Sequence, residues 1–378
     1  MSERTVVVVF PSIFSLNKIN FLKSSISRIL KAKKRGFGKI QKNDSVIIVE
    51  ANDPVFASSA ISSLFGIEKI AIATEVENSF DAVVSTIAKV GTNLLLKGER
   101  FYVKVEGKTS AYSPKDVELA ATSSLIEKMS SLETKPGTEE NFDKLLYTYL
   151  TKSHAYICIF IDKGGGGIPH KSQNETILCC VYDELSIISC LQTLKMGFDV
   201  QILVCYSNET DLLNMVKMIN QILPRIAETA VELQFFNLKL RSRNSSSLLL
   251  KVAVITEILT HVAITTKIGR ISLAVSPLIF PTWFVEYIAT HVYQKNLIPW
   301  FPLSGIDNSI FETANEIGLE KHLSKIENLC QLKFNRNHIP KEKIHKISQM
   351  ALRTRKSITI TIGQKNIHDI IDSLKSNH

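Results

Sequence analysis

The sequence has little glycine and proline, no cysteine or histidine pattern of a metal site, and no early apolar run of useful length. With 16 glycines and 11 prolines in 378 residues, it is neither fibrous nor of low complexity. Val6–Phe10, ended by Pro11, is too short for a signal peptide and is typical of a first β-strand. We find no apolar run of membrane-spanning length, so we expect no membrane partner. The length predicts two or three domains.

Cysteine and histidine are too scattered to predict a metal site. The nine histidines form no H-x-x-H or H-E-x-x-H pair, and no cysteine pair has zinc-finger spacing with a second pair to match it. Five of the six cysteines lie in apolar segments that resemble buried strands or a helix: Cys158, Cys179, Cys180, Cys190 and Cys205. We interpret them as reduced core thiols, which predicts a cytoplasmic location.

Acidic residues are absent from one strongly basic segment. The chain carries a net charge of +9, and between Asn17 and Asn43 there are nine Lys or Arg and no Asp or Glu. Leu22, Ile26 and Ile29 recur at helical spacing, which predicts a helix with a basic outer side. A solvated helix face is the alternative, but such a face usually mixes both signs. We therefore predict RNA contacts from Lys18, Lys23, Arg28, Lys31, Lys34 and Arg35.

The second half of the chain alternates regularly between strand and helix patterns after Gly164–Gly167. Expected strands are 176–181, 200–205, 231–236 and 271–275, and expected helices are 184–196, 211–223, 248–261 and 284–295. This alternation predicts a parallel sheet with helices on both faces, that is, an α/β domain. The first half mixes strands and helices less regularly, which predicts an α+β fold. Gly164–Gly167 precedes a strand and no Lys-Ser/Thr pair follows, so we interpret it as a turn between domains.

Several strings, in order along nearly the whole chain, resemble the tRNA thiouridine synthase (ThiI) family. The strings are Phe101–Val105 followed by Ser113–Glu118, then Gly166–Pro169, and then Pro302–Asp307 with Ile317-Gly318. The resemblance implies a ferredoxin-like domain at 1–50, a THUMP RNA-binding domain at 51–163 and a Rossmann-like, ATP-pyrophosphatase-like domain at 164–352, followed by a tail at 353–378. It implies tRNA or another structured RNA as partner, with Lys104 and Lys108 near the THUMP surface. Leu119 stands where the family motif has an arginine.

The phosphate-binding loop of that family has been lost here. Counted without gaps from Pro169, the family's S-G-G-x-D-S string falls on Val181, Tyr182, Asp183, Glu184, Leu185 and Ser186. Such a loop needs glycines, so that backbone N–H groups can close on phosphate at a helix N-terminus. Two carboxylates beside a polyphosphate each add about 4 kcal/mol of repulsion per contact at about 4 Å, for an effective dielectric near 20. The family's S-Q-T string is likewise changed, to Ser276-Pro277-Leu278.

Cys330 falls where the family keeps its sulfur-carrying cysteine, and it is the candidate catalytic residue. Lys325, Lys333 and Arg336 are close in sequence, and positive neighbours favour the thiolate. Without the ATP loop, however, a sulfur carrier has no activated nucleobase to act on. The alternative is an inherited packing cysteine.

The favoured interpretation is an RNA-binding, catalytically inactive relative of the thiouridine synthases that uses no cofactor. The first alternative is an active tRNA sulfurtransferase in which ATP and Mg²⁺ are held by an unorthodox loop or a partner subunit. The second is a protein-interaction module whose Asp183 and Glu184 dock a basic partner. Whether the chain forms a homodimer or binds a partner protein stays open.

Overall fold

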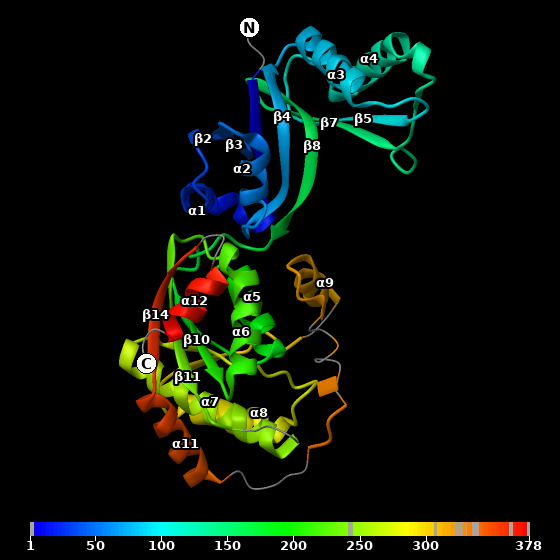
Figure 1. Ribbon diagram of the computed structural model, residues 1–378. Helices are drawn as coiled ribbons and strands as arrows, with labels where there is room; N and C mark the ends of the chain where they lie inside the picture. The colour runs from blue at the N-terminus through cyan, green and yellow to red at the C-terminus, as the bar shows by residue number, and fades with distance from the viewer. Residues whose placement is uncertain are drawn as a thin grey trace. The chain divides into compact units, whose positions relative to one another are not determined.

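The computed structural model describes residues 4–240, 245–305, 308–321, 324, 328–329, 331–334, 340–362 and 366–375 (Figure 1). The chain forms two compact units. Unit 1 comprises Met1–Ser63 and Ile67–Gly166, and unit 2 comprises Leu64–Gly66 and Gly167–His378. Cys330, the candidate sulfur carrier, and Asp307, the last residue of the string Pro302–Asp307, lie outside the described residues.

Unit 1 is built on one sheet with the strand order β2-β3-β1-β4-β8-β7-β5-β6. Its strands are β1 (Arg4–Pro11), β2 (Phe37–Asn43), β3 (Val46–Ala51), β4 (Ile67–Glu77), β5 (Arg100–Gly107), β6 (Lys135–Pro136), β7 (Lys144–Leu150) and β8 (His154–Gly166). Its helices are η1 (Ile13–Lys18), α1 (Ile19–Ala32), α2 (Pro54–Ile61), α3 (Phe80–Leu94), α4 (Pro114–Lys128) and η2 (Ser130–Leu132).

The first part of unit 1 is a β-α-β-β-α-β arrangement of the ferredoxin-like type. Strands β2, β3, β1 and β4 are neighbours in that order, and each pair is antiparallel. Val7 is opposite Val49 of β3 and Ile72 of β4, so β4 is an integral strand of this arrangement. The ferredoxin-like arrangement therefore extends to Glu77, and its sheet continues across the boundary expected at residue 50.

The second part of unit 1 extends the same sheet and is covered by α3 and α4. Strand β8 pairs with β4, β7 pairs antiparallel with β8, and β5 pairs parallel with β7. Three strands of unit 1, β2, β6 and β7, were not predicted from the sequence. Strand β7 is an almost continuous apolar run that alternation does not reveal, and β2 is a polar edge strand with little buried surface.

Unit 2 is a doubly wound sheet with the strand order β13-β12-β9-β10-β11-β14. Its strands are β9 (Thr176–Val181), β10 (Asp199–Tyr206), β11 (Ala230–Asn237), β12 (Arg270–Ser272), β13 (Ile298–Trp300) and β14 (Lys356–Thr361). Its described helices are α5 (Glu184–Lys195), α6 (Glu209–Ile222), η3 (Leu223–Arg225), α7 (Ser245–Thr266), α8 (Thr282–Tyr293), α9 (Asn308–Glu316), α11 (Lys341–Arg353) and α12 (Asn366–Lys375).

The strand order of unit 2 reverses direction between β9 and β12. Strands β9, β10 and β11 are parallel and successive, whereas β12 and β13 lie on the other side of β9 and are also parallel to it. The expected α/β architecture is confirmed. The segment expected as a tail contributes β14, which pairs antiparallel with β11. In such sheets ligands bind outside the carboxyl ends of the strands at the point of reversal, here the end of β9.

Helix α7 contains an apolar run of membrane-spanning length, which the sequence analysis did not identify. Its segment Ser247–Thr266 has a mean hydropathy of 1.8, which by length and composition alone is enough to cross a membrane. In unit 2, however, 72% of its apolar window is buried, and Val254, Ile258 and Val262 pack into the core of the unit. This is also what the core helix of a soluble protein looks like.

The five cysteines expected in the core are buried and free of disulfides. Successive residues of a strand point to opposite faces, and Cys179 and Cys180 of β9 follow this rule. Cys179 lies against Cys190 of α5, whereas Cys180 lies against Cys205 of β10. Burial and the neighbouring thiol raise the pKa of both Cys180 and Cys190, which keeps these thiols protonated and unreactive.

Candidate functional site

The basic segment of unit 1 begins with Lys18, the last residue of η1, and continues on α1, whose inner side is apolar. Leu22, Ile26 and Ile29 are fully buried, and the first turn of the helix has no acidic residue. At about 100° per residue, Lys23 and Arg28 lie about 140° apart around the helix, with Lys31 between them. Lys31 is exposed and the other two are partly buried. The cations therefore surround the outer side of α1 and do not form a narrow stripe.

Lys34, which is predicted to contact RNA, lies beyond the end of the helix. Helix α1 ends at Ala32, and Lys34 adopts a left-handed conformation with φ of 53°. Its N–H donates to the carbonyl of Lys31 at 3.0 Å, and the N–H of Arg35 donates to the carbonyl of Leu30 at 2.8 Å. These two bonds form a Schellman motif, in which glycine usually occupies the left-handed position. The motif turns the chain and directs the following residue away from the helix axis.

Arg35 lies against an aromatic side chain that the sequence reasoning missed. Its guanidinium carbon is 4.4 Å from the centre of the Phe56 ring. Phe56 is in the first turn of α2, where Asp53 caps the helix by accepting bonds from the N–H groups of Val55 and Phe56 at 3.1 Å. The Phe56 side chain is nevertheless 52% exposed. An aromatic residue two positions after the Asp53-Pro54 helix start was the one available signal.

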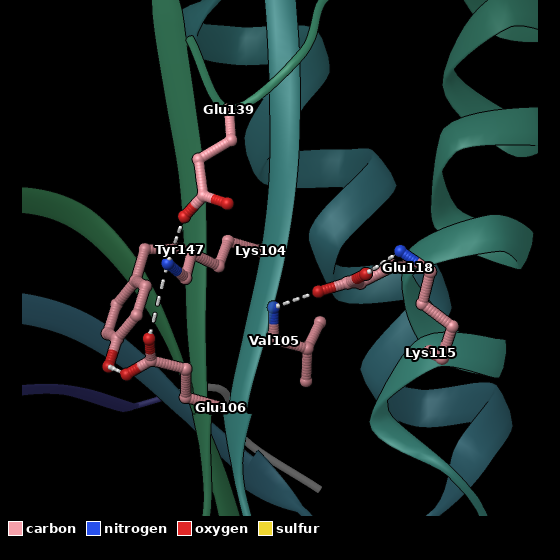
Figure 2. A network of polar contacts seen from close by, with 7 residues as sticks. All are labelled: Lys104, Val105, Glu106, Lys115, Glu118, Glu139 and Tyr147. Atoms are coloured by element: carbon pink, nitrogen blue, oxygen red, sulfur yellow. Dashed lines mark hydrogen bonds and ion pairs between the residues drawn. The ribbon is translucent and has the colours of Figure 1, made fainter.

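Lys104, predicted to contact RNA, is paired with carboxylates of its own unit (Figure 2). Its Nζ atom lies 2.8 Å from Glu139 and 3.5 Å from Glu106. The hydrogen bond to Glu139 is the largest of the effects that raise the pKa of Lys104. Glu106 also accepts a hydrogen bond from the hydroxyl of Tyr147 at 2.7 Å. The positive charge of Lys104 is thus matched within the protein, whereas Lys108 is exposed.

The start of α4 is held by a carboxylate, as Figure 2 shows for Glu118. This side chain accepts from the N–H of Val105 and from Lys115, both at 2.9 Å. Ser113 caps the helix by accepting from the N–H of Lys115. The motif 113–118 therefore ties helix α4 to strand β5. Leu119, which replaces the arginine of the family motif, is 61% exposed.

In unit 2, the start of α5 at the end of β9 satisfies its own backbone groups. Asp183 accepts from the N–H of Ser186 at 2.8 Å, and the Ser186 hydroxyl accepts from the N–H groups of Tyr182 and Asp183 at 2.8 and 2.9 Å. This is a reciprocal capping box. The N–H groups of all three residues therefore already have partners inside the protein.

Tyr182 fills the space beside this capping box. Its side chain is only 4% exposed. Its hydroxyl donates to the carbonyl of Ala274 at 3.4 Å, and Ala274 follows β12, the strand beside β9 at the point of reversal. Lys251 of α7 donates to the Tyr182 carbonyl at 2.9 Å and lies 5.4 Å from the ring centre. Burial is the largest effect on the Asp183 carboxyl and raises its pKa, while the charge of Lys251 lowers it.

The remaining positions of the loop complete this packing. Val181 and Leu185 are buried, and Glu184 is partly exposed. Ser276 is buried and accepts the N–H of Leu278 at 3.3 Å, so it stabilises a turn. A bound triphosphate would need free N–H groups and space at the start of α5. The side chains and hydrogen bonds present there do not fit such a ligand.

A separate cavity of about 450 Å³ lies among α7, α8 and α11 of unit 2. Trp283 and Tyr287 line it, together with Glu257 and His291, whose side chains approach to 2.7 Å. The contact with His291 is the largest of the effects that lower the pKa of Glu257. Trp283, Tyr287 and His291 lie on α8 and Glu257 lies on α7, and no motif pointed to them.

The two units together define a fold that solved structures share. A 4-thiouridine synthetase, determined in complex with RNA and with bound ATP, superimposes with a TM-score of 0.71 at 17% identity, over 95% of this chain and 100% of that one. PH1313 from Pyrococcus horikoshii Ot3 superimposes with a TM-score of 0.64 at 18% identity, over 83% of this chain and 100% of that one. No protein-family model and no curated protein matches the chain. The chain thus has a fold like that of a thiouridine synthetase.

Proposed function

We propose that the protein binds structured RNA, and tRNA in particular, through unit 1. The observation that carries this proposal is the segment 17–43, which has nine cations and no carboxylate and runs from the end of η1 through α1 into β2. The solved 4-thiouridine synthetase of similar fold was determined with RNA, which supports the same class of ligand. Most protein contacts to a nucleic acid involve phosphate and sugar, and they depend on such cations.

RNA binding of this kind has a defined salt dependence. Each phosphate neutralised by a Lys or Arg releases counterions, so the logarithm of affinity falls with the logarithm of salt by about 0.9 per contact on a duplex. We expect the substitution of Lys23, Arg28, Lys31 and Lys34 by glutamine to reduce this slope by up to about 3.6. The slope is measured by fluorescence anisotropy of labelled tRNA over a series of salt concentrations.

A matched control removes four exposed cations from unit 2 instead. Substituting Lys267, Lys295, Lys343 and Lys346 by glutamine changes the net charge by the same amount. We expect this variant to keep the slope of the natural protein. Equal slopes for the natural protein and the α1 variant would refute RNA binding through this segment.

We propose further that unit 2 neither binds nor hydrolyses ATP and acts as a scaffold or partner surface. The support is the capping box of Asp183 and Ser186, together with the buried side chain of Tyr182. Active tRNA sulfurtransfer is the competing function, in which the two carboxylates at the start of α5 hold Mg²⁺ and Cys330 carries sulfur. Carboxylate oxygens are suitable ligands for that ion.

Titration calorimetry with Mg²⁺ and ATP separates these two functions. We expect no binding heat from the natural protein. We also expect none from a Tyr182→Gly/Asp183→Gly variant, because Leu185 stands where the family motif has an aspartate. Micromolar ATP binding by the natural protein, with release of pyrophosphate when tRNA is added, would establish the sulfurtransferase instead.

A further inference from the structure

We propose that Arg35 and Phe56 form a stacking platform for an unpaired nucleobase of the bound RNA. This proposal rests on the proposed RNA binding. It adds a site for one nucleobase to the cations that contact phosphates. It joins the end of α1 to the start of α2, two segments of the ferredoxin-like part of unit 1.

The aromatic ring of Phe56 lies at the surface, so its burial contributes little to the stability of the folded unit. Its side chain is 52% exposed, and the neighbouring Val55 is 64% exposed. The backbone beneath both is fixed by Asp53, whose carboxylate accepts both of their N–H groups at 3.1 Å. An exposed ring on a rigid first turn loses little conformational entropy when a flat ligand stacks on it.

Arg35 holds its guanidinium over this ring by a second fixed piece of backbone. The Schellman motif at the end of α1 sets the direction in which Arg35 leaves the helix, and its guanidinium carbon lies 4.4 Å from the ring centre. Lys34 adopts the left-handed conformation that the motif requires, although glycine would do so with less strain. The cation of Lys34 thus lies beside the platform, although its backbone conformation is strained.

The chemistry of the platform favours RNA over other occupants. Unpaired bases in RNA stack on aromatic rings and on guanidinium planes, and cations beside them contact the flanking phosphates. Lys31 and Lys34 supply such cations within four residues of Arg35, in a segment without any carboxylate. An acidic peptide would match the charge but would have no flat group for the ring.

The first experiment removes the ring. Phe56→Ala in the full chain is expected to weaken binding of a hairpin with an unpaired extension by about tenfold, the size typical for loss of one stacked base. Binding of the same stem with a blunt end should not change, and the salt slope should not change either. Phe160→Ala is the matched control, because Phe160 is also 52% exposed and also belongs to unit 1. Equal affinity of Phe56→Ala and natural protein for the extended hairpin would overturn the platform.

The second experiment observes stacking directly. The two native tryptophans, Trp283 and Trp300, both belong to unit 2, so Phe56→Trp adds the first tryptophan of unit 1. We expect RNA with an unpaired extension to quench this added fluorescence, and the blunt stem to leave it unchanged. Quenching by polyglutamate to the same extent would overturn the assignment to a nucleobase.

The two proposals fail in different ways. If the natural protein binds neither hairpin, the proposed function itself is wrong. If it binds both hairpins with a steep salt slope and Phe56→Trp is not quenched, RNA binding stands and the platform is wrong. Arg35→Lys, which keeps the charge and loses the flat guanidinium, should weaken binding of the extended hairpin only.

Discussion

Residues 17–43 of unit 1 and the start of α5 in unit 2 differ in charge and in how their polar groups are used. The first segment has nine cations and no carboxylate, whereas α5 begins with Asp183 and Glu184. The N–H groups of Tyr182, Asp183 and Ser186 bond to side chains of the same turn, and the Tyr182 side chain packs beside them. The charge of the α1 segment is left to be neutralised from outside the segment. A shared fold alone does not establish a function, and we propose ligand binding only for the first of these two positions.

The largest effect expected from this comparison concerns Tyr182. If its ring is a fixed part of the core, Tyr182→Ala should lower the free energy of unfolding by about 3–5 kcal/mol, as for other large buried aromatic side chains. Tyr182→Phe should cost less than about 1 kcal/mol, since the hydroxyl makes one long contact, of 3.4 Å. Urea unfolding followed by the fluorescence of Trp283 and Trp300 reports on this unit. A small cost for the alanine variant would mean that the ring is a movable cover over the strand ends.

The next effect concerns the cap of α5 and depends on pH. Asp183→Ala should lower the free energy of unfolding by about 1 kcal/mol through loss of the N-cap. Burial raises the pKa of Asp183 above the ordinary 3.8, so the folded protein holds this proton more tightly than the unfolded chain does. Its contribution to stability is therefore full below about pH 4 and is lost as pH rises through the folded pKa.

Asp183→Asn separates the cap from the charge. Asparagine also caps helices but does not titrate. We expect this variant to lose less stability than the natural protein between pH 4 and neutrality, when both are unfolded in urea at each pH. Identical pH profiles would show that the carboxyl group is not held in a buried environment.

The elements predicted from sequence are those whose pattern is local. Strand β9 was placed at its observed bounds, because a short apolar run between turn signals is distinctive. Strand β4 was predicted but was assigned to the second domain, because its pairing with β1 joins residues about sixty positions apart, such as Val7 and Ile72. Pairing between distant strands leaves no local signal. For this reason a domain boundary was expected near residue 50, although the sheet continues across it.

The same distinction applies to the candidate sites. The capping box of Asp183 and Ser186 has the spacing of three residues that marks a helix start, and the sequence did place a helix there. The pairing of Lys104 with Glu139 spans 35 residues, and the contact of Arg35 with Phe56 crosses two strands. The sequence therefore predicts where a positive charge lies near a motif. The residues that contact it are brought together only when the sheet folds.

Lys34 offers a smaller test, in which stability and RNA affinity change in opposite directions. Lys34→Gly should raise the free energy of unfolding of unit 1 by about 0.5–1 kcal/mol, because glycine adopts a φ of 53° without strain. The matched variant Lys31→Gly lies within α1 and should lower it by up to about 1 kcal/mol. Each variant removes one cation, so each should reduce the salt slope of RNA binding by about 0.9. Circular dichroism during urea unfolding and anisotropy with tRNA measure the two quantities. An unchanged slope for both would leave the α1 cations without a role in binding.

The smallest effect is expected at Lys104, whose paired charge is compared here with the exposed Lys31 of α1. To contact a phosphate, Lys104 would have to leave Glu139 at 2.8 Å and Glu106 at 3.5 Å, and two carboxylates would then remain beside the RNA. Lys104→Gln should therefore change the salt slope by about 0.3 or less, against about 0.9 for Lys31→Gln. Glu139→Gln leaves Lys104 with one carboxylate and should raise RNA affinity slightly, with a steeper slope. A full change of about 0.9 from Lys104→Gln would show that RNA displaces Glu139. The pairing seen within the protein would then be a resting arrangement that RNA opens, and the RNA surface would extend from α1 to strand β5.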